Sequence, residues 1–146
     1  MKRNQIGFSL IELMVVVAII AVLVVVALPI LHNNKERAAI IESLNVIGNI
    51  KTSIESDLNL SRDISQQSYN TPTGVSISNG SRLGASVNIN LSQTSPQHFS
   101  NPNDIIKLDA VASGSTIQWT CLHNINASTL TTNNVPATCR GTYSTV

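Results

Sequence analysis

The sequence predicts an α+β protein in which a long N-terminal α-helix packs its second half on an antiparallel β-sheet, followed by a disulfide-bounded C-terminal loop. Three observations support this fold class. An uncharged apolar run covers Leu13–Leu31, an amphipathic pattern continues to Leu58, and segments of alternating polarity follow residue 85. Both cysteines lie in the last third of the chain. The 146 residues suit one domain, and a head so poor in apolar residues needs a staple or a partner.

The apolar run has the length of a membrane-crossing helix. Its nineteen residues carry no charge, amide or hydroxyl, and about 20 such residues span a bilayer core. Lys2 and Arg3 precede the run, as in a secretory signal. The run is longer than the core of a cleaved signal, and its far end offers no convincing small-residue cleavage site. A plain membrane anchor explains the length but leaves one feature unexplained, the acid that precedes the run.

That acid is Glu12. A charged side chain in a membrane segment costs about 3 kcal/mol, so a group that offsets this cost is expected near it. Proteolysis after Gly7 would create one, because the new amino group of Phe8 lies four residues before Glu12. The two groups can pair within one chain or between neighbouring chains. Pairing between neighbours would neutralise both charges and set the axial register of packed helices.

These residues resemble a known processing signal. Lys2-Arg3 and the stretch Gly7-Phe8-Ser9-Leu10-Ile11-Glu12 resemble the class III leader and methylation motif of type IV pilins, of the type IVa kind, and Pro29 also stands where that family has a proline. The resemblance implies cleavage after Gly7 by prepilin peptidase and N-methylation of Phe8. It also implies that Phe8, Glu12 and Pro29 act in assembly, with Glu12 pairing with the Phe8 amine of a neighbouring subunit.

One position departs from the family pattern. Pilins often carry a glycine where this chain has Ala21, which is a good helix former. In filaments of the family the helix loses regularity between that position and the proline. Pro29 removes a backbone donor, and the β-branched valines before it weaken helix somewhat. We therefore expect the helix to melt near Val22–Pro29 in a filament, although Ala21 favours this melting less than a glycine would.

The helix continues beyond Pro29 as an amphipathic helix. Apolar residues recur at helical spacing, which marks one face: Ile40, Leu44, Ile47, Ile50, Ile54 and Leu58. A single helix from about Phe8 to about Leu60 would be roughly 80 Å long at 1.5 Å per residue. Because this length exceeds the thickness of a membrane, the second half is expected in the head, under strands.

Three strands are predicted after the helix, at 86–91, 104–111 and 116–122, with Ser113-Gly114-Ser115 as a hairpin turn. Residues 61–85 are expected to form a connecting loop, and the chain after Cys121 an irregular loop. In an exported segment, an even pair of cysteines favours a disulfide between Cys121 and Cys139 over a metal site. This bond would restrict the unfolded chain by about 3 kcal/mol.

No catalytic constellation is found in the sequence, so no enzymatic activity, no cofactor and no metal are expected. The three histidines are scattered without metal-ligand spacing, and His123 is interpreted as a surface residue. The formal charge of +1 gives no strong attraction to nucleic acid. Only proximity of Arg82, Lys107 and Arg140 in the folded head would change this view.

The chain is thus interpreted as four segments: a cleaved leader at 1–7, a transmembrane and filament-core helix at 8–31, an amphipathic head helix at 32–60, and the loop, sheet and disulfide region at 61–146. The expected function is that of a structural pilin, stored in the inner membrane with its head in the periplasm and polymerised into a surface pilus. Prepilin peptidase and the pilus assembly machinery would be its partners. Adhesion, twitching motility or DNA uptake would be activities of the polymer, with DNA or a host surface as its ligand. The alternatives are a minor pilin, a type II secretion pseudopilin, or a membrane-anchored DNA-binding or adhesin module.

Overall fold

The computed structural model describes residues 7–126 and 128–144. They fall into two compact units, one up to Asn33 and one from Asn34 onward. Of the predicted leader, only Gly7 belongs to the described residues.

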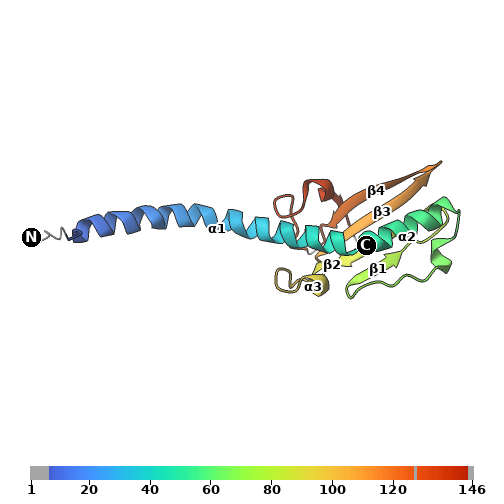
Figure 1. Cartoon of the computed structure of the whole chain (residues 1–146), viewed down its shortest axis with the longest axis horizontal. Helices are drawn as coiled ribbons and strands as arrows, with labels where there is room; N and C mark the ends of the chain where they lie inside the picture. Colours follow the sequence, from blue (N-terminus) through green and yellow to red (C-terminus); the bar gives the residue numbers. More distant parts are fainter. Residues whose placement is uncertain (1–6, 127, 145–146) are drawn as a thin grey trace, which may run out of the picture. The chain divides into compact units, whose positions relative to one another are not determined.

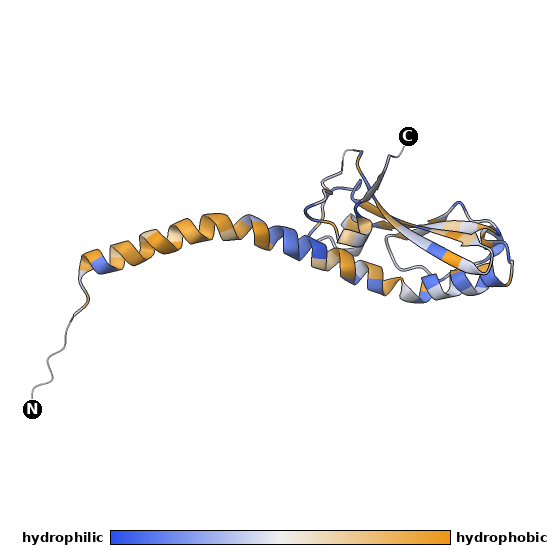
Figure 2. Cartoon of the chain, turned by 90° about the horizontal axis from the view of Figure 1, so that it is seen from above, coloured by the Kyte–Doolittle hydropathy of each residue, from blue (hydrophilic) through white to orange (hydrophobic). Residues whose placement is uncertain are grey.

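The first unit is the apolar part of helix α1, which runs from Leu10 to Val46. Figure 2 shows the apolar colouring along this part of the helix. Within the described ranges, α1 is the one helix that has the length and composition to cross a membrane. A helix satisfies its backbone hydrogen bonds internally, which is what a membrane interior requires of a spanning segment.

The second unit begins with the last part of α1 and continues into α2, Gly48–Asn59. The predicted single helix is therefore interrupted, by a turn at Ile47. Gly48 is the weakest helix former nearby, which explains the place of the break. The Lys51 N–H still donates to the Ile47 carbonyl at 3.0 Å, so the interruption is slight. The predicted apolar face is confirmed: Leu44 is partly buried and its other five members are buried.

Five strands form one sheet in the order β1-β2-β3-β4-β5, beside α2 (Figure 1). The strands are β1 Val75–Ser78, β2 Gly84–Asn90, β3 Ile105–Ser113, β4 Thr116–Asn124 and β5 Gly141–Tyr143. The first four are antiparallel neighbours, and β5 lies parallel to β4. Three short helical turns complete the unit: η1 Ile64–Gln66 between α2 and β1, α3 Leu91–Thr94 between β2 and β3, and η2 Ala137–Cys139 between β4 and β5.

The core lies between the helix face and one face of the sheet. Alternate residues of the central strands are buried there, among them Val87, Ile89, Ile106 and Leu108. Every second side chain of a strand points to the same face, so the apolar residues of the alternating pattern are the ones that form this packed layer. The α+β fold class is confirmed.

The three predicted strands are confirmed as β2, β3 and β4, with shifted ends. The turn between β3 and β4 is also confirmed, and Gly114 adopts the positive φ of 63° that this tight turn favours. Two strands were missed. β1 lies inside the predicted 61–85 loop, and β5 lies inside the predicted irregular C-terminal loop. They are only four and three residues long, so neither carries the longer alternation that identified the central strands.

Candidate functional site

The apolar helix has no packing partner within its own unit. Every described side chain from Gly7 to His32 is exposed, and Phe8 is 84% exposed. Removing such a surface from water is favourable by roughly 25 cal/mol for each Å². The segment therefore requires lipid or other apolar helices around it.

Glu12 lies in the first turn of α1 and is the acidic residue of that turn. Its carboxylate accepts a hydrogen bond from the Ser9 N–H at 3.3 Å. Since Ser9 directly precedes the helix, this contact is one half of a capping box, in which a Glu or Gln of the first turn reaches back to the capping residue. Within a single chain, Glu12 thus supports the helix start. One hydrogen bond leaves most of the acceptor capacity of the carboxylate unused.

Pro29 lies inside α1, which continues through it. Proline has no N–H, so the Val25 carbonyl, four residues earlier, has no helical donor. Ala21 is helical as well. The predicted loss of helix between Val22 and Pro29 refers to the filament and stays a prediction.

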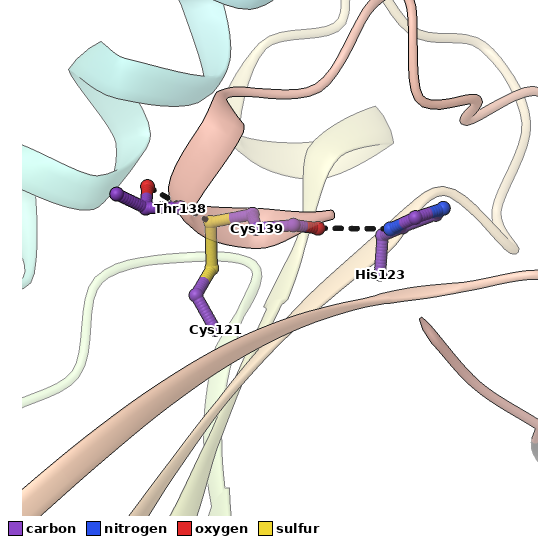
Figure 3. Close-up of a disulfide and its surroundings, with 4 residues drawn as sticks. All are labelled: Cys121, His123, Thr138 and Cys139. Carbon is purple, nitrogen blue, oxygen red and sulfur yellow. Dashed lines mark hydrogen bonds between the residues drawn. A yellow bond between two sulfur atoms is a disulfide. The ribbon is translucent and has the colours of Figure 1, made fainter. Parts of the chain in front are cut away.

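The two cysteines are joined by a disulfide between Cys121 on β4 and Cys139 in η2 (Figure 3). The Nδ1–H of His123 donates to the Cys139 carbonyl at 2.8 Å, and the Thr138 hydroxyl lies 3.9 Å from the Cys139 sulfur. His123 is 2% exposed, so its interpretation as a surface residue is wrong. It lies on the inner face of β4, where it fixes the loop end that the disulfide closes.

A buried carboxylate holds the other end of this loop. Asp104 is fully buried and accepts three hydrogen bonds, from the Thr129 N–H and hydroxyl, both at 2.7 Å, and from the Ser128 hydroxyl at 2.9 Å. A carboxylate in such a position needs charge-assisted hydrogen bonds to offset its desolvation. Nothing in the sequence distinguished this aspartate from a strand-edge residue.

The loop is also attached to the part of α1 that belongs to the second unit. The Asn134 amide donates to Glu36 at 2.8 Å, and Arg37 donates to the Asn133 carbonyl at 2.6 Å. With the disulfide and Asp104, these contacts hold the region from Asn126 to Arg140 at four places. We call this region the closed loop.

Trp119 on β4 contacts α2 through two polar groups that sequence reasoning missed. Its indole N–H donates to Glu55 at 2.6 Å, and the Lys51 amine lies 4.9 Å from its ring centre. Lys51 and Glu55 are four residues apart and therefore share one side of the helix. That spacing indicates a shared polar side of the helix, but it does not indicate which strand packs against it.

Two basic residues of the head, Lys107 and Arg62, are engaged in local contacts. Lys107 pairs with Asp109 at 3.1 Å and lies 5.4 Å from the Tyr143 ring centre, and Arg62 pairs with Asp57 at 3.2 Å. Burial raises the pKa of the Tyr143 phenol, and the charge of Asp109 raises it further. These contacts leave Lys107 less available to a phosphate backbone than an unpaired surface lysine would be.

The family models match most of the chain. The prokaryotic N-terminal methylation motif matches residues 2–28, and the model described as PilE, C-terminal, matches residues 34–144. Among solved structures, the Francisella tularensis pilin PilE is 65% identical, with a TM-score of 0.73, and the match covers 76% of this chain and 97% of that one.

Curated relatives match over shorter stretches. Fimbrial protein EcpB of Eikenella corrodens is 44% identical over 55 residues, which are 38% of this chain and 35% of EcpB. A type IV major fimbrial protein FimA of Dichelobacter nodosus is 43% identical over 58 residues, 40% of this chain and 37% of the relative. The chain thus spans little more than a third of the length of these two relatives.

The PilE model covers well over half of the chain, and the solved pilin shares both its fold and its sequence. The chain therefore belongs to the type IV pilin family, as a pilin with a PilE-type C-terminal region.

Proposed function

We propose that this pilin is cleaved after Gly7, N-methylated on Phe8, held in the inner membrane by residues 8–31, and then polymerised through the same helix into a surface pilus. The observation that carries the proposal is the exposed apolar helix with one acid at its start. Residues 32–60 then serve as the head helix and residues 61–146 as the outer head.

Assembly follows from the chemistry of the helix start. In the membrane, an apolar helix gains little by leaving lipid for other apolar helices, so packing and polar contacts decide whether it associates. The Phe8 amine and the Glu12 carboxylate supply one such contact, because each is poorly satisfied alone in an apolar medium. Their pairing between neighbours sets the axial register of the packed helices.

The Glu12→Gln variant tests this step. Glutamine keeps the acceptor oxygen for the Ser9 N–H, so the helix cap is retained while the charge is removed. We expect a normal membrane pool and a severe loss of sheared surface filaments. Glu42→Gln, at an exposed carboxylate farther along α1, is the matched control and should form filaments normally. Wild-type piliation by Glu12→Gln would contradict the proposed pairing.

Adhesion, twitching motility and DNA uptake are proposed as activities of the polymer. The abundance of this chain in the filament distinguishes a major pilin from a minor one. A sheared filament made mostly of this chain identifies a major pilin, and a trace amount identifies a minor one.

A further inference from the structure

Strand β4 is only partly covered at the edge of the sheet. It has nine residues, but β5 pairs only with the last three, Leu122–Asn124. Within the described ranges, no strand pairs with Thr116–Thr120 on that side. On that side this stretch, which we call the free edge, therefore presents unpaired backbone groups.

The register defines which groups are unpaired. The Ala112 N–H donates to the Leu83 carbonyl, toward the β2 side, so the neighbouring residues of β3 direct their backbone groups toward β4. Val111 and Asp109 thus bond to their partners Gln118 and Thr120. The alternating residues of the free edge, Ile117 and Trp119, direct their N–H and C=O groups away from the sheet.

The free edge lacks the features that usually prevent edges from pairing. Exposed edges commonly carry lysine, proline or a bulge. Here Thr116, Gln118 and Thr120 are exposed and uncharged, and Ile117 and Trp119 are partly buried on the inner face. An isologous contact through this strand would bring no like charges of the strand together.

We propose that the free edge pairs antiparallel with the free edge of a second copy of this chain, with Gln118 opposite Gln118. This register places Ile117 of each copy opposite Trp119 of the other, and these two pairs exchange the four outward hydrogen bonds. An aromatic side chain opposite a β-branched one is a favourable cross-strand pair. On the outer face, Thr116 lies opposite Thr120, so every pair in the register is compatible.

The symmetry of this contact indicates where the second copy comes from. The contact is two-fold, whereas successive subunits of one polar filament are related head to tail. The second copy therefore belongs to a neighbouring filament, and the free edge links filaments laterally. Each contact is small, but the many copies displayed along two filaments act together. The inference rests on the proposed polymerisation.

Cysteine crosslinking of sheared filaments tests the register. In an antiparallel pair, Gln118 and its counterpart form a non-hydrogen-bonded pair with Cα atoms about 4.5 Å apart, within disulfide range. Both native cysteines are in the disulfide, so Gln118→Cys adds the one free thiol of the sequence. After mild oxidation, we expect a dimer band on a non-reducing gel. Thr116→Cys and Thr120→Cys are matched controls that should each give none, because like residues are then more than about 13 Å apart. Mixed filaments of these two variants should crosslink.

Charge substitutions test whether the contact bundles filaments. Gln118→Lys places like charges opposite each other, so the low-speed pellet of bundled filaments should be largely lost, and Gln118→Glu should act in the same way. A mixture of the two filaments should pellet again. Ser76→Lys, on the exposed part of the opposite edge strand β1, should leave bundling unchanged.

Intact wild-type filaments that fail to bundle, or cysteine variants at positions 116, 118 and 120 that all crosslink equally, would overturn the inference and leave the proposed function standing. Absence of any wild-type filament would overturn the proposed function itself.

Discussion

Removal of the disulfide should destabilise the head by a calculable amount. Cys121 and Cys139 are separated by 18 positions, and a bond that closes a loop of this length lowers the entropy of the unfolded chain by an equivalent of about 3 kcal/mol. Cys139 is fully buried, and its carbonyl is held by His123. Cys121 is partly buried and packs against the core, so reduction removes a bond between two positions that other contacts also hold.

The expected shift is large enough to measure with the native fluorophore. Trp119 is the single tryptophan, and it contacts α2 through Glu55 and Lys51, so separation of β4 from α2 changes its environment. With a urea slope of about 1.5 kcal/mol per molar, a loss of about 3 kcal/mol lowers the unfolding midpoint by about 2 M. The measurement is a urea titration of the full chain in mild detergent, followed by Trp119 fluorescence.

Two samples separate the crosslink from the change of side chain. The wild-type chain is titrated with and without reductant, and the Cys121→Ala/Cys139→Ala variant is titrated in the same way. The variant should match the reduced wild type within a few tenths of a molar and should not respond to reductant. A reduced wild type that unfolds at the oxidised midpoint would refute the assigned role of the bond.

Three further perturbations use the same titration. Asp104→Ala leaves the Thr129 and Ser128 donors without their acceptor, so the free energy of unfolding should fall by about 3 kcal/mol. Backbone amides of the closed loop should also exchange faster with solvent, and unchanged exchange would contradict the anchoring role of Asp104. At Gly84, an added Cβ would overlap the Ala110 carbonyl oxygen of the adjacent strand, so Gly84→Ala should lower the free energy of unfolding by about 2 kcal/mol. An unchanged urea midpoint would show that the two strands move apart there without cost. Burial, and then the hydrogen bond to Asp57, raise the pKa of Tyr69 above its ordinary value of about 10. The folded state thus binds the phenol proton more tightly, so this stability is complete below about pH 10 and is lost as the pH rises further; Tyr69→Phe should flatten the alkaline decline, and an equally steep decline would contradict this.

Local periodicity made the helix and the central sheet predictable. The apolar residues of the helix from Ile40 to Leu58 recur at helical spacing, and five of the six are buried. Strands β2 and β3 alternate strictly enough to be recognised, because one face is buried and the other is polar. The hairpin between β3 and β4 was predictable because Gly114 supplies a conformation that other residues adopt reluctantly.

Contacts between distant segments were not predictable in the same way. β5 is three residues long and is held beside β4 by the disulfide, so its own sequence has no periodicity to detect. His123 and Asp104 are polar residues that are buried because the closed loop folds over them. Their burial depends on partners 16 to 25 positions away, and no spacing rule names those partners.

For the N-terminal segment, the sequence is more informative than the single-chain structure. The charge of Glu12 and the apolar run from Leu13 to Leu31 define a helix that needs a partner, and the structure confirms that no neighbour from its own unit covers it. The groups that would complete this site, a free Phe8 amine and adjacent helices, arise only through processing and assembly.

Mass analysis of the subunit in a sheared surface fraction tests the central claim most directly. We predict a subunit that begins at Phe8 with one added methyl group on its amine, that lacks Met1–Gly7, and that carries both cysteines oxidised. A subunit that retains those seven residues, or a chain recovered only from membranes and never in filaments, would contradict the account.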